Sequence, residues 1–535
     1  MKNGKLYSFK YNLLLSLSGV ILFYLSHPNK LVLTGIPVFG YIALAPFFLL
    51  IKRTSLKFSV LWGAFSGFLS YLAFNFWILF FHQAAVYVIT GYYLILYALL
   101  FALLKIVDIF FPRYGFIFQA LVWVGYEYVK TLGFMGYPYG IIGYTQWNFP
   151  TLIRSSAVLG VWGISLLLVF FSSISAVFIY EFTLNKSLKT TVKLYGKYTA
   201  IWLGCFCAFF LYGIFAKTDY SSYKKAKLAL IQPNTDPWVG NIEVYKNNFY
   251  DLKTLSEKAV AENSDISLVV WPETAFIPRI KWHYKYSSDM QSAALVRNLL
   301  EFLNGQTVPY LIGNDDAVPI GETGEGRLDY NAAMLFVPSK NVIPPEPDTY
   351  RKMHLVPFTE HFPYKNIFPF IYRLLEKSDT HFWERGEERF VFNINGIKFG
   401  TPICFEDCFG YISADFVKKG ADLIVNMTND AWAKSAVPQY QHLSMAVFRA
   451  AENKVPVVRA ASSGQTAYID PNGEIKAMLK PFSKDVLTVE VPILTETAKT
   501  VYSFAGDYFA VIISVVTFSA VIAAAIKRIY LKLRS

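Results

Sequence analysis

The apolar stretches of this chain constrain its architecture more than any motif does. Seven of them precede about residue 217 and one follows about residue 505, with a segment of mixed polarity between them. Most approach the ~20 residues that an α-helix needs to cross the hydrocarbon core of a bilayer. They cover residues 11–27, 31–51, 58–81, 85–104, 114–130, 157–181, 198–216 and 506–526. We therefore predict an α-helical membrane bundle of about eight transmembrane helices.

The first apolar stretch has a second interpretation. It follows several lysines, as the apolar region of a cleaved signal peptide does. It lacks a small-residue cleavage site, however, and further apolar stretches follow at once. We interpret it as a retained helix, and a signal peptide remains the alternative.

The basic residues near the apolar stretches predict the orientation of the chain. One alternating set of connections carries sixteen lysines and arginines, whereas the opposite set carries Lys30, Lys130 and Arg154. The larger set consists of Lys2, Lys5, Lys10, Lys52, Arg53, Lys57, Lys105, Arg113, Lys186, Lys189, Lys193, Lys197, Lys527, Arg528, Lys532 and Arg534. Basic residues mark cytoplasmic loops, so both termini are predicted to be cytoplasmic and the middle segment external. The net charge of +12 is then largely a topology signal, which argues against binding to nucleic acid.

The segment from residue 218 to residue 500 has the pattern of a layered α/β domain. Short β-branched runs closed by Pro, Gly or Asn predict strands, at 226–234, 265–273, 308–315, 331–338, 389–396, 397–406, 422–430, 455–464 and 465–473. Helical spacing appears at 244–263, 287–305 and 438–454. The predicted parts are a membrane domain of seven helices (1–217), an α/β domain (218–500) and a C-terminal transmembrane helix with a basic tail (501–535).

The stretch "GTPICFEDCFG" places two of the four cysteines, Cys404 and Cys408, close together. A buried structural cysteine is the simplest interpretation of Cys404. A disulfide between them would close a very short loop at a strand end, which is geometrically awkward. A zinc site is weakly supported, because the chain has no CxxC pair and its seven histidines are scattered. The other two cysteines, Cys205 and Cys207, lie in the seventh apolar stretch.

Two other motifs favour a reactive thiol. "SLVVWPETAF" ends a strand with Glu273, and "YRKMHLVPFTEHFPY" contains Lys352 and Glu360. A thiol, a carboxylate base and a lysine are the groups needed for acyl transfer through a thioester. Spacing in the sequence does not show that they converge.

These motifs resemble those of the carbon–nitrogen hydrolase, or nitrilase, superfamily. "WPETAF", "YRKMHLVPFTEHFPY", "GTPICFED" and the stretch "NMTNDAWAKSAVPQYQH" through "TAYIDPNG" occur in that family's order. With its flanking apolar stretches and "GFMGYPYGIIGYTQWNFP", nearly the whole chain is similar to the apolipoprotein N-acyltransferase family. The resemblance implies a nitrilase-like α-β-β-α sandwich carried on the membrane bundle, at the cell inner membrane with the sandwich in the periplasm.

The resemblance also implies roles for individual residues. Cys404 would be the nucleophile, Glu273 the general base and Lys352 the cation that stabilises the oxyanion. The supporting residues would be Glu360 and Glu406. The implied substrate contacts are Phe405, which follows the nucleophile, and Trp238, whose position matches a tryptophan of the acyltransferases. Structural interpretations remain open for the secondary positions: a salt-bridge partner for Glu360, a solvated turn for Glu406 and ordinary packing for Trp238.

The implied reaction moves a fatty acyl chain from a phospholipid, phosphatidylethanolamine by the resemblance, to the N-terminal amine of a diacylglyceryl-cysteine apolipoprotein. It would proceed through a thioester on Cys404 and need no metal or organic cofactor. The alternatives are a membrane-tethered amidase or nitrilase with the same triad, and a non-catalytic membrane scaffold for a glycosyltransferase.

Some positions depart from the family or fall outside its motifs. Thr359 stands where the family has Gly, and Ala433 where it often has an aromatic residue. The apolar segment 361–375 is hypothesised to be a lid that dips into the outer leaflet, with a satellite core as the alternative. Glu127 either lines a cavity in the membrane or lies at the interface with Lys130.

Overall fold

The computed structural model describes residues 9–81, 83–286, 289–321, 326–377, 381–495 and 500–534. The basic residues Lys2 and Lys5 of the predicted cytoplasmic set lie outside these ranges. The chain forms two compact units. The first comprises Met1–Lys217, Tyr440–Glu452 and Ala505–Ser535, and the second comprises Thr218–Gln439 and Asn453–Phe504.

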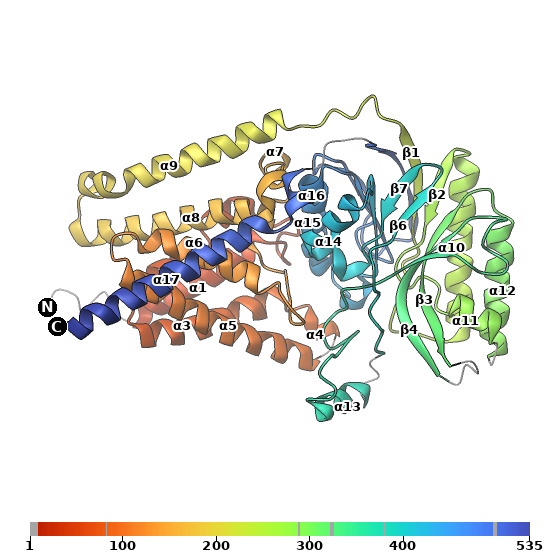
Figure 1. Cartoon of the computed structure of the whole chain (residues 1–535), viewed down its shortest axis with the longest axis horizontal. Helices are drawn as coiled ribbons and strands as arrows, with labels where there is room; N and C mark the ends of the chain where they lie inside the picture. Colours follow the sequence, from red (N-terminus) through yellow and green to blue (C-terminus); the bar gives the residue numbers. More distant parts are fainter. Residues whose placement is uncertain are drawn as a thin grey trace. The chain divides into compact units, whose positions relative to one another are not determined.

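The first unit is built from helices (Figure 1). Its elements are α1 (Phe9–Ser26), η2 (Pro37–Tyr41), α2 (Ala45–Arg53), α3 (Leu56–Phe74), α4 (Ile78–Phe81), α5 (Gln83–Phe110), α6 (Gly115–Val129), η3 (Ile142–Gln146), α7 (Pro150–Ile153), α8 (Ser156–Asn185), α9 (Leu188–Phe215) and α17 (Tyr508–Arg534). Within the described residues, six helices are long and apolar enough to cross a membrane. They are Phe9–Ser26, Leu56–Phe74, Ala85–Phe110, Ser156–Asn185, Leu188–Phe215 and Tyr508–Ile526.

Two predicted spans differ from the structure. Residues 31–51 do not form one helix but a loop, the short turn η2 and the nine-residue helix α2. Proline lacks the N–H that a continuous helix needs, and Pro37 and Pro46 lie at the starts of these two elements. The span at 114–130 corresponds to α6, which has 15 residues and is about 22 Å long, less than the ~30 Å of a bilayer core.

The first helix packs into the bundle. Val20 and Phe23 are buried, and the hydroxyl groups of Ser16 and Ser66 lie 2.7 Å apart, which joins α1 to α3.

Glu127 and Lys130 hold a loop of the first unit. Both are buried. The Lys130 ammonium donates to the Tyr139 carbonyl oxygen at 2.7 Å, and Glu127 Oε1 accepts from the Ile142 N–H at 2.8 Å. One of the two interpretations placed Lys130 at the membrane interface with its ammonium in water. The burial of Lys130 contradicts that interpretation.

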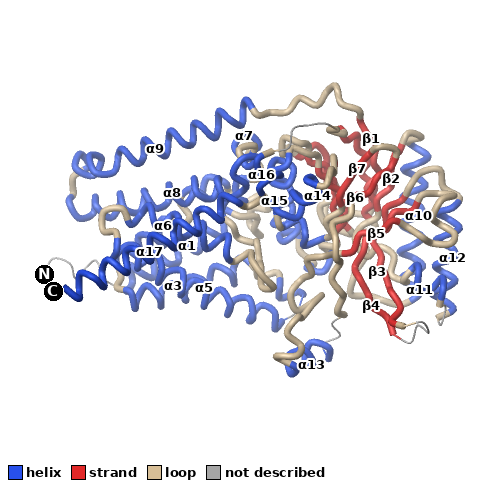
Figure 2. Tube along the Cα trace, viewed as in Figure 1, coloured by secondary structure: helices blue, strands red, loops and turns tan. Residues whose placement is uncertain are grey.

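The second unit contains two six-stranded sheets within its described residues (Figure 2). The first has the order β12-β1-β2-β3-β4-β5 and the second β11-β10-β9-β8-β7-β6. Their bounds are β1 (Lys225–Gln232), β2 (Ile266–Val270), β3 (Tyr310–Ile320), β4 (Gly326–Phe336), β5 (Asp348–Arg351), β6 (Val391–Ile394), β7 (Ile397–Gly400), β8 (Leu423–Thr428), β9 (Val457–Ala461), β10 (Ala467–Ile469), β11 (Ile475–Met478) and β12 (Asp485–Pro492).

Both sheets have parallel strands at the centre and antiparallel strands at the edges. The parallel neighbours are β1, β2 and β3 in the first sheet and β7, β8 and β9 in the second. The ends of parallel strands meet at one edge, where ligand sites of α/β proteins gather. The segments that follow β2 in the first sheet and β7 and β8 in the second are therefore candidates for a site.

Helices cover the outer faces of the sheets (Figure 1). The described helical elements of this unit are α10 (Ile242–Glu262), α11 (Ile280–Lys285), α12 (Met290–Asn304), α13 (Pro369–Lys377), η4 (Cys404–Cys408), α14 (Gly410–Lys418), η5 (Ala431–Ala433), the ends of α15 (Ala436–Asn453) and α16 (Val501–Ala505). One apolar cluster joins α10 and α12 to the first sheet, through Leu252, Leu299 and Trp271 among others. The predicted strands and helices occur at the expected places, and the layered α/β prediction is confirmed.

Candidate active site

Glu273 lies three residues beyond the end of β2 and is held by three donors. The Lys352 ammonium lies 3.2 Å from Glu273 Oε1, and Asn331 Nδ2 donates to the same oxygen at 2.8 Å. The Asn429 N–H donates to Oε2 at 2.9 Å. Both oxygens are thus fixed, and the carboxylate has one orientation.

Gly313 of β3 lets the Glu273 backbone approach the sheet. A Cβ at this position would lie 2.3 Å from the Pro272 carbonyl oxygen and 2.8 Å from the Glu273 Cα. Both neighbours are backbone atoms, so a side chain here would force the segment that carries Glu273 to move.

Lys352 follows β5 and is fully buried between two carboxylates. Its ammonium lies 3.2 Å from Glu273 Oε1 and 2.7 Å from Glu360 Oε1. Burial opposes the charged form, but the charges of Glu273, Glu360 and Cys404 outweigh it and raise the pKa of Lys352 well above its usual value. Lys352 is therefore a fixed cation at neutral pH, within electrostatic reach of Cys404.

Glu360 is the second carboxylate that holds Lys352. Its Oε2 accepts the Val356 N–H at 2.8 Å. Burial raises the pKa of Glu360, while Lys352 lowers it and Glu273 raises it again, so the pKa lies above the ordinary value. The left-handed residue of this turn is Phe358 (φ 63°) rather than Thr359, the position where the family has Gly.

Cys404 begins the 3-10 turn η4 directly after an extended segment. It has the left-handed backbone (φ 50°) that non-glycine residues rarely adopt, a strain typical of functional sites. Its side chain is partly exposed, whereas Cys408 at the end of the turn is buried. The structure contains no disulfide between these two described cysteines.

Glu406 fastens this turn to the segment that carries Lys352. Its carboxylate accepts the N–H groups of Ile403 at 2.9 Å, Met353 at 2.9 Å and His354 at 3.0 Å. Tyr350 and Arg389 complete its surroundings. Glu406 is fully buried, so the interpretation as a solvated turn residue was wrong.

Phe405 and Trp238 lie in different surroundings. Phe405 is buried against the rings of His354 and Phe409, whose centroids are 5.8 Å and 5.1 Å away. Burial lowers the pKa of His354 to about 4, so this ring is neutral at pH 7. Trp238 is 48% exposed, and its indole N–H donates to the Trp432 carbonyl oxygen at 3.2 Å. Ala433 is buried.

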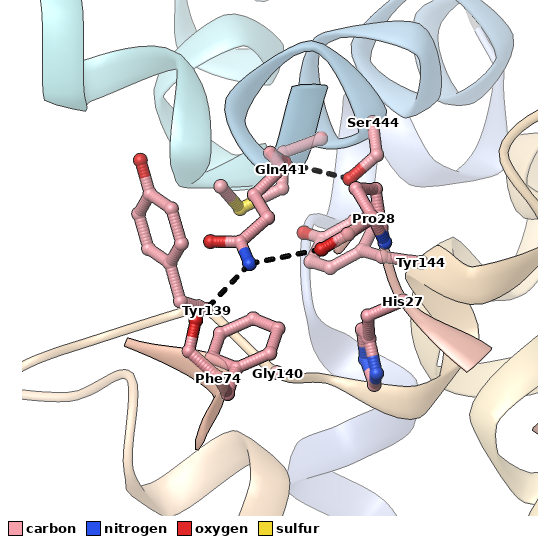
Figure 3. Close-up of a pocket in the computed structure, with 9 residues that line it drawn as sticks. His27, Pro28, Phe74, Tyr139, Gly140, Tyr144, Gln441 and Ser444 are labelled. Atoms are coloured by element: carbon pink, nitrogen blue, oxygen red, sulfur yellow. Dashed lines mark hydrogen bonds between the residues drawn. The ribbon is translucent and has the colours of Figure 1, made fainter. Parts of the chain in front are cut away.

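A pocket in the first unit carries none of this chemistry (Figure 3). Gln441 donates to the carbonyl oxygens of Pro28 at 3.1 Å and Phe74 at 3.3 Å. The ring nitrogens of His27 face the carbonyl oxygens of Phe23 and Ile141. With these polar groups already partnered, the pocket has the character of a structural junction.

The cluster in the second unit has the parts of a covalent acyl-transfer site. Its carboxylate can accept a thiol proton, its partly exposed sulfur can attack a carbonyl carbon, and its fixed ammonium can stabilise the resulting oxyanion.

Comparisons with known proteins give two family matches. A family model described as carbon-nitrogen hydrolase matches residues 227–499, and one described as apolipoprotein N-acyltransferase N-terminal domain matches residues 18–174. The chain is 61% identical over 525 residues to "Apolipoprotein N-acyltransferase 1" of Treponema denticola, with 96% of each chain covered. It is 45% identical over 530 residues to "Apolipoprotein N-acyltransferase 1" of Treponema pallidum, with 96% of this chain and 95% of that one covered.

The chain belongs to the apolipoprotein N-acyltransferase family. Among solved structures, it is similar to Saccharomyces cerevisiae Nit3, a member of branch 10 of the nitrilase superfamily. That match has 22% identity and a TM-score of 0.36, and it covers 54% of this chain and 95% of that chain.

Family membership confirms several predictions. The chain is an acyltransferase with a nitrilase-like domain on membrane helices, and it is an inner-membrane protein. The amidase or nitrilase and the non-catalytic scaffold are not favoured.

Sequence reasoning missed several contacts of the candidate site. Asn331 donates to Glu273, and Tyr350 and Arg389 donate to Glu406. A polar residue at the start of the apolar run "NAAMLF" was a usable signal for Asn331. The other two residues gave no comparable signal, because their role depends on the pairing of β4 with β5 and on the path of the loop before β6.

We expect the substitution Gly313→Ala to impair catalysis by displacing Glu273. A displacement of about 1 Å at a reacting group costs about 10²-fold in rate. The measurement is the acyl-transfer rate per folded molecule. Gly326→Ala is the matched control, because a Cβ there meets only Ile320 at 3.5 Å, an ordinary contact. A wild-type rate for Gly313→Ala would contradict the expectation that the position of Glu273 matters for catalysis.

Proposed function

We propose that this acyltransferase moves a fatty acyl chain from a phospholipid to the N-terminal amine of a diacylglyceryl-cysteine apolipoprotein, through a thioester on Cys404. The observation that carries the proposal is the burial of Lys352 between Glu273 and Glu360, within electrostatic reach of the only one of the two η4 cysteines that is partly exposed. The names of the relatives support the choice of acceptor.

In the first half-reaction, Glu273 takes the proton of the Cys404 thiol. The thiolate sulfur forms a bond to the ester carbonyl carbon of the phospholipid, and Lys352 stabilises the oxyanion. The C–O bond to the glycerol oxygen then breaks, and Glu273 returns its proton to that oxygen. The products are a lysophospholipid and an acyl-Cys404 thioester.

In the second half-reaction, the α-amine of the apolipoprotein attacks the thioester carbonyl carbon. Lys352 again stabilises the oxyanion, and Glu273 accepts a proton from the attacking nitrogen. The C–S bond breaks and the sulfur regains a proton, which leaves an amide on the acceptor and the enzyme in its starting state. Atoms and charges balance without a metal or an organic cofactor.

Four further residues have supporting roles in this proposal. Glu360 holds Lys352 in place, and Glu406 holds the Cys404 turn against the Lys352 segment. Phe405 and Trp238 are proposed to contact substrate. The half-exposed indole of Trp238 is consistent with that role.

The exposed apolar side chains of the helix α13 are consistent with a lipid substrate. None of its residues is buried, and it exposes Phe370 by 77% and Leu374 by 54%. Exposed apolar side chains of this kind suit a surface that meets lipid. Within the proposal, α13 belongs to a lid that admits the acyl chains, and phosphatidylethanolamine is the donor.

The proposed topology has the catalytic domain (218–500) in the periplasm. The membrane domain (1–217) delivers it there, and the C-terminal helix with its basic tail (501–535) returns the chain to the cytoplasm. The excess of basic residues in one set of connections supports cytoplasmic termini.

We expect ping-pong kinetics with phosphatidylethanolamine and a diacylglyceryl-cysteine peptide, because both substrates share one thioester. Double-reciprocal plots at several donor concentrations should be parallel. Cys404→Ala should abolish transfer, whereas Cys408→Ala, which changes the other cysteine of the same turn, should retain it. Intersecting plots, or activity in Cys404→Ala, would rule out the shared thioester.

The topology is tested with a membrane-impermeant maleimide in a Cys404→Ser background. Glu257→Cys on α10 should be labelled in intact spheroplasts, whereas Lys189→Cys near the start of α9 should be labelled only after permeabilisation. The reverse pattern would place the α/β domain in the cytoplasm.

A further inference from the structure

Arg459 is a fully buried cation in the centre of the second sheet. It lies on β9, and its side chain has no exposure to solvent. Burying a charge is costly unless partners of opposite sign offset the loss of hydration. Arg459 has two such partners: Nη1 donates to Asp407, and Nη2 donates to Asp430 Oδ2 at 3.3 Å.

The two aspartates lie on the segments that carry the nucleophile and a donor to the base. Asp407 belongs to the turn η4, three residues after Cys404. Asp430 directly follows Asn429, whose N–H donates to Glu273 Oε2 at 2.9 Å. One guanidinium therefore ties the sulfur-bearing turn to the loop that orients the carboxylate.

Asp430 is itself closely confined. Its Oδ1 accepts from the Thr428 hydroxyl at 3.2 Å. A Cβ at Gly464 would lie 2.9 Å from its Oδ2, so the backbone after β9 packs closely against this carboxylate. Asp430 cannot follow a displaced Arg459 without moving the segment that contains Asn429.

Glu406 supplies the complementary connection on the same turn. It joins η4 to the Lys352 segment, whereas Asp407 joins η4 to Arg459 and Asp430. Cys404 thus begins a turn that is held by two separate sets of contacts. Such restraint fits the left-handed backbone of Cys404, which persists only where its surroundings over-determine it.

The net charge around Arg459 indicates that this residue positions Cys404 rather than activating its thiol directly. Burial opposes the charge of Arg459, but Asp407 and Asp430, then Cys408 and Cys404, raise its pKa. The guanidinium and its two carboxylates together carry one net negative charge. That group would not favour a thiolate by charge alone, so its contribution is geometric.

We propose that Arg459 is a positioning residue that aligns Cys404 with Glu273 by holding Asp407 and Asp430 together. The proposal rests on the catalytic roles given to Cys404 and Glu273 above. A planar guanidinium reaches two carboxylates at once, whereas the compact ammonium of lysine does not match both.

The first test is Arg459→Lys in the full-length enzyme. We expect the rate of Cys404 acylation per folded molecule to fall about 10²-fold, with the KM for the phospholipid unchanged, because charge is kept while alignment is lost. Arg449→Lys is the control, since Arg449 is equally buried and pairs with Glu452. It should lower the melting temperature and leave the acylation rate intact.

A second readout does not depend on acyl transfer. Arg459→Met leaves two buried carboxylates without their cation, so the pH midpoint of Cys404 alkylation by iodoacetamide should rise by about one unit or more. Arg459→Lys should keep the wild-type midpoint. Alkylation is measured on the Cys404 peptide by mass spectrometry, which excludes a contribution from Cys408.

The isosteric variants Asp407→Asn and Asp430→Asn keep the test decisive if the arginine variants do not fold. Wild-type acylation rates and wild-type alkylation midpoints in both aspartate variants would overturn the proposal. It would also be overturned if the lower acylation rate of Arg459→Lys were fully explained by its lower melting temperature. A wild-type enzyme that phospholipid never acylates would overturn the proposed function instead, while the alkylation midpoints would still show whether Arg459 offsets the charge of Asp407 and Asp430 near Cys404.

Discussion

The buried ion cluster of Lys352 with Glu273 and Glu360 is the interaction on which the rest of the site depends. An ammonium with no exposure is stable only if nearby carboxylates offset its lost hydration, and here they lie 3.2 Å and 2.7 Å away. The strand order brings β2 and β5 into the same sheet, and the segments that follow these strands carry Glu273 and Lys352. The second sheet then contributes the Cys404 turn, which Glu406 fastens to the lysine segment.

Much of the fold of the second unit could be predicted because buried central strands have strong sequence signals. Runs such as "ISLVV" and "LIVNMT" are short, apolar and closed by turn residues. The strands that sequence reasoning missed are β5, β11 and β12, and each lies at the edge of a sheet. An edge strand buries less of its surface, so its residues are more polar and its pattern is weaker. The same weakness of local signals explains the difference at 31–51, where prolines divide an apolar stretch into short elements.

The residues of the candidate site also differ in how well the sequence predicts them. Recognisable motifs follow β2, β5 and β7. They contain Glu273, Lys352, Glu360 and Cys404, and the structure gathers these residues in one unit. Their partners could not be found in this way. The register of the β3–β4–β5 antiparallel pairs decides which side chain meets Glu273, and a single-residue slip would turn every side chain to the other face. In the sequence, Arg459 is only a charged residue within an apolar strand. Its role becomes apparent when the structure shows that it contacts Asp407 and Asp430.

The central claim is that a phospholipid acyl chain becomes covalently attached to Cys404. The most direct measurement is the mass of the Cys404 peptide after the purified enzyme has been incubated with phosphatidylethanolamine of a single acyl composition and no acceptor. The account predicts an added acyl group on Cys404, lost on treatment with hydroxylamine and transferred when a diacylglyceryl-cysteine peptide is supplied. An unmodified Cys404 in an enzyme that still forms the N-acylated product would contradict it.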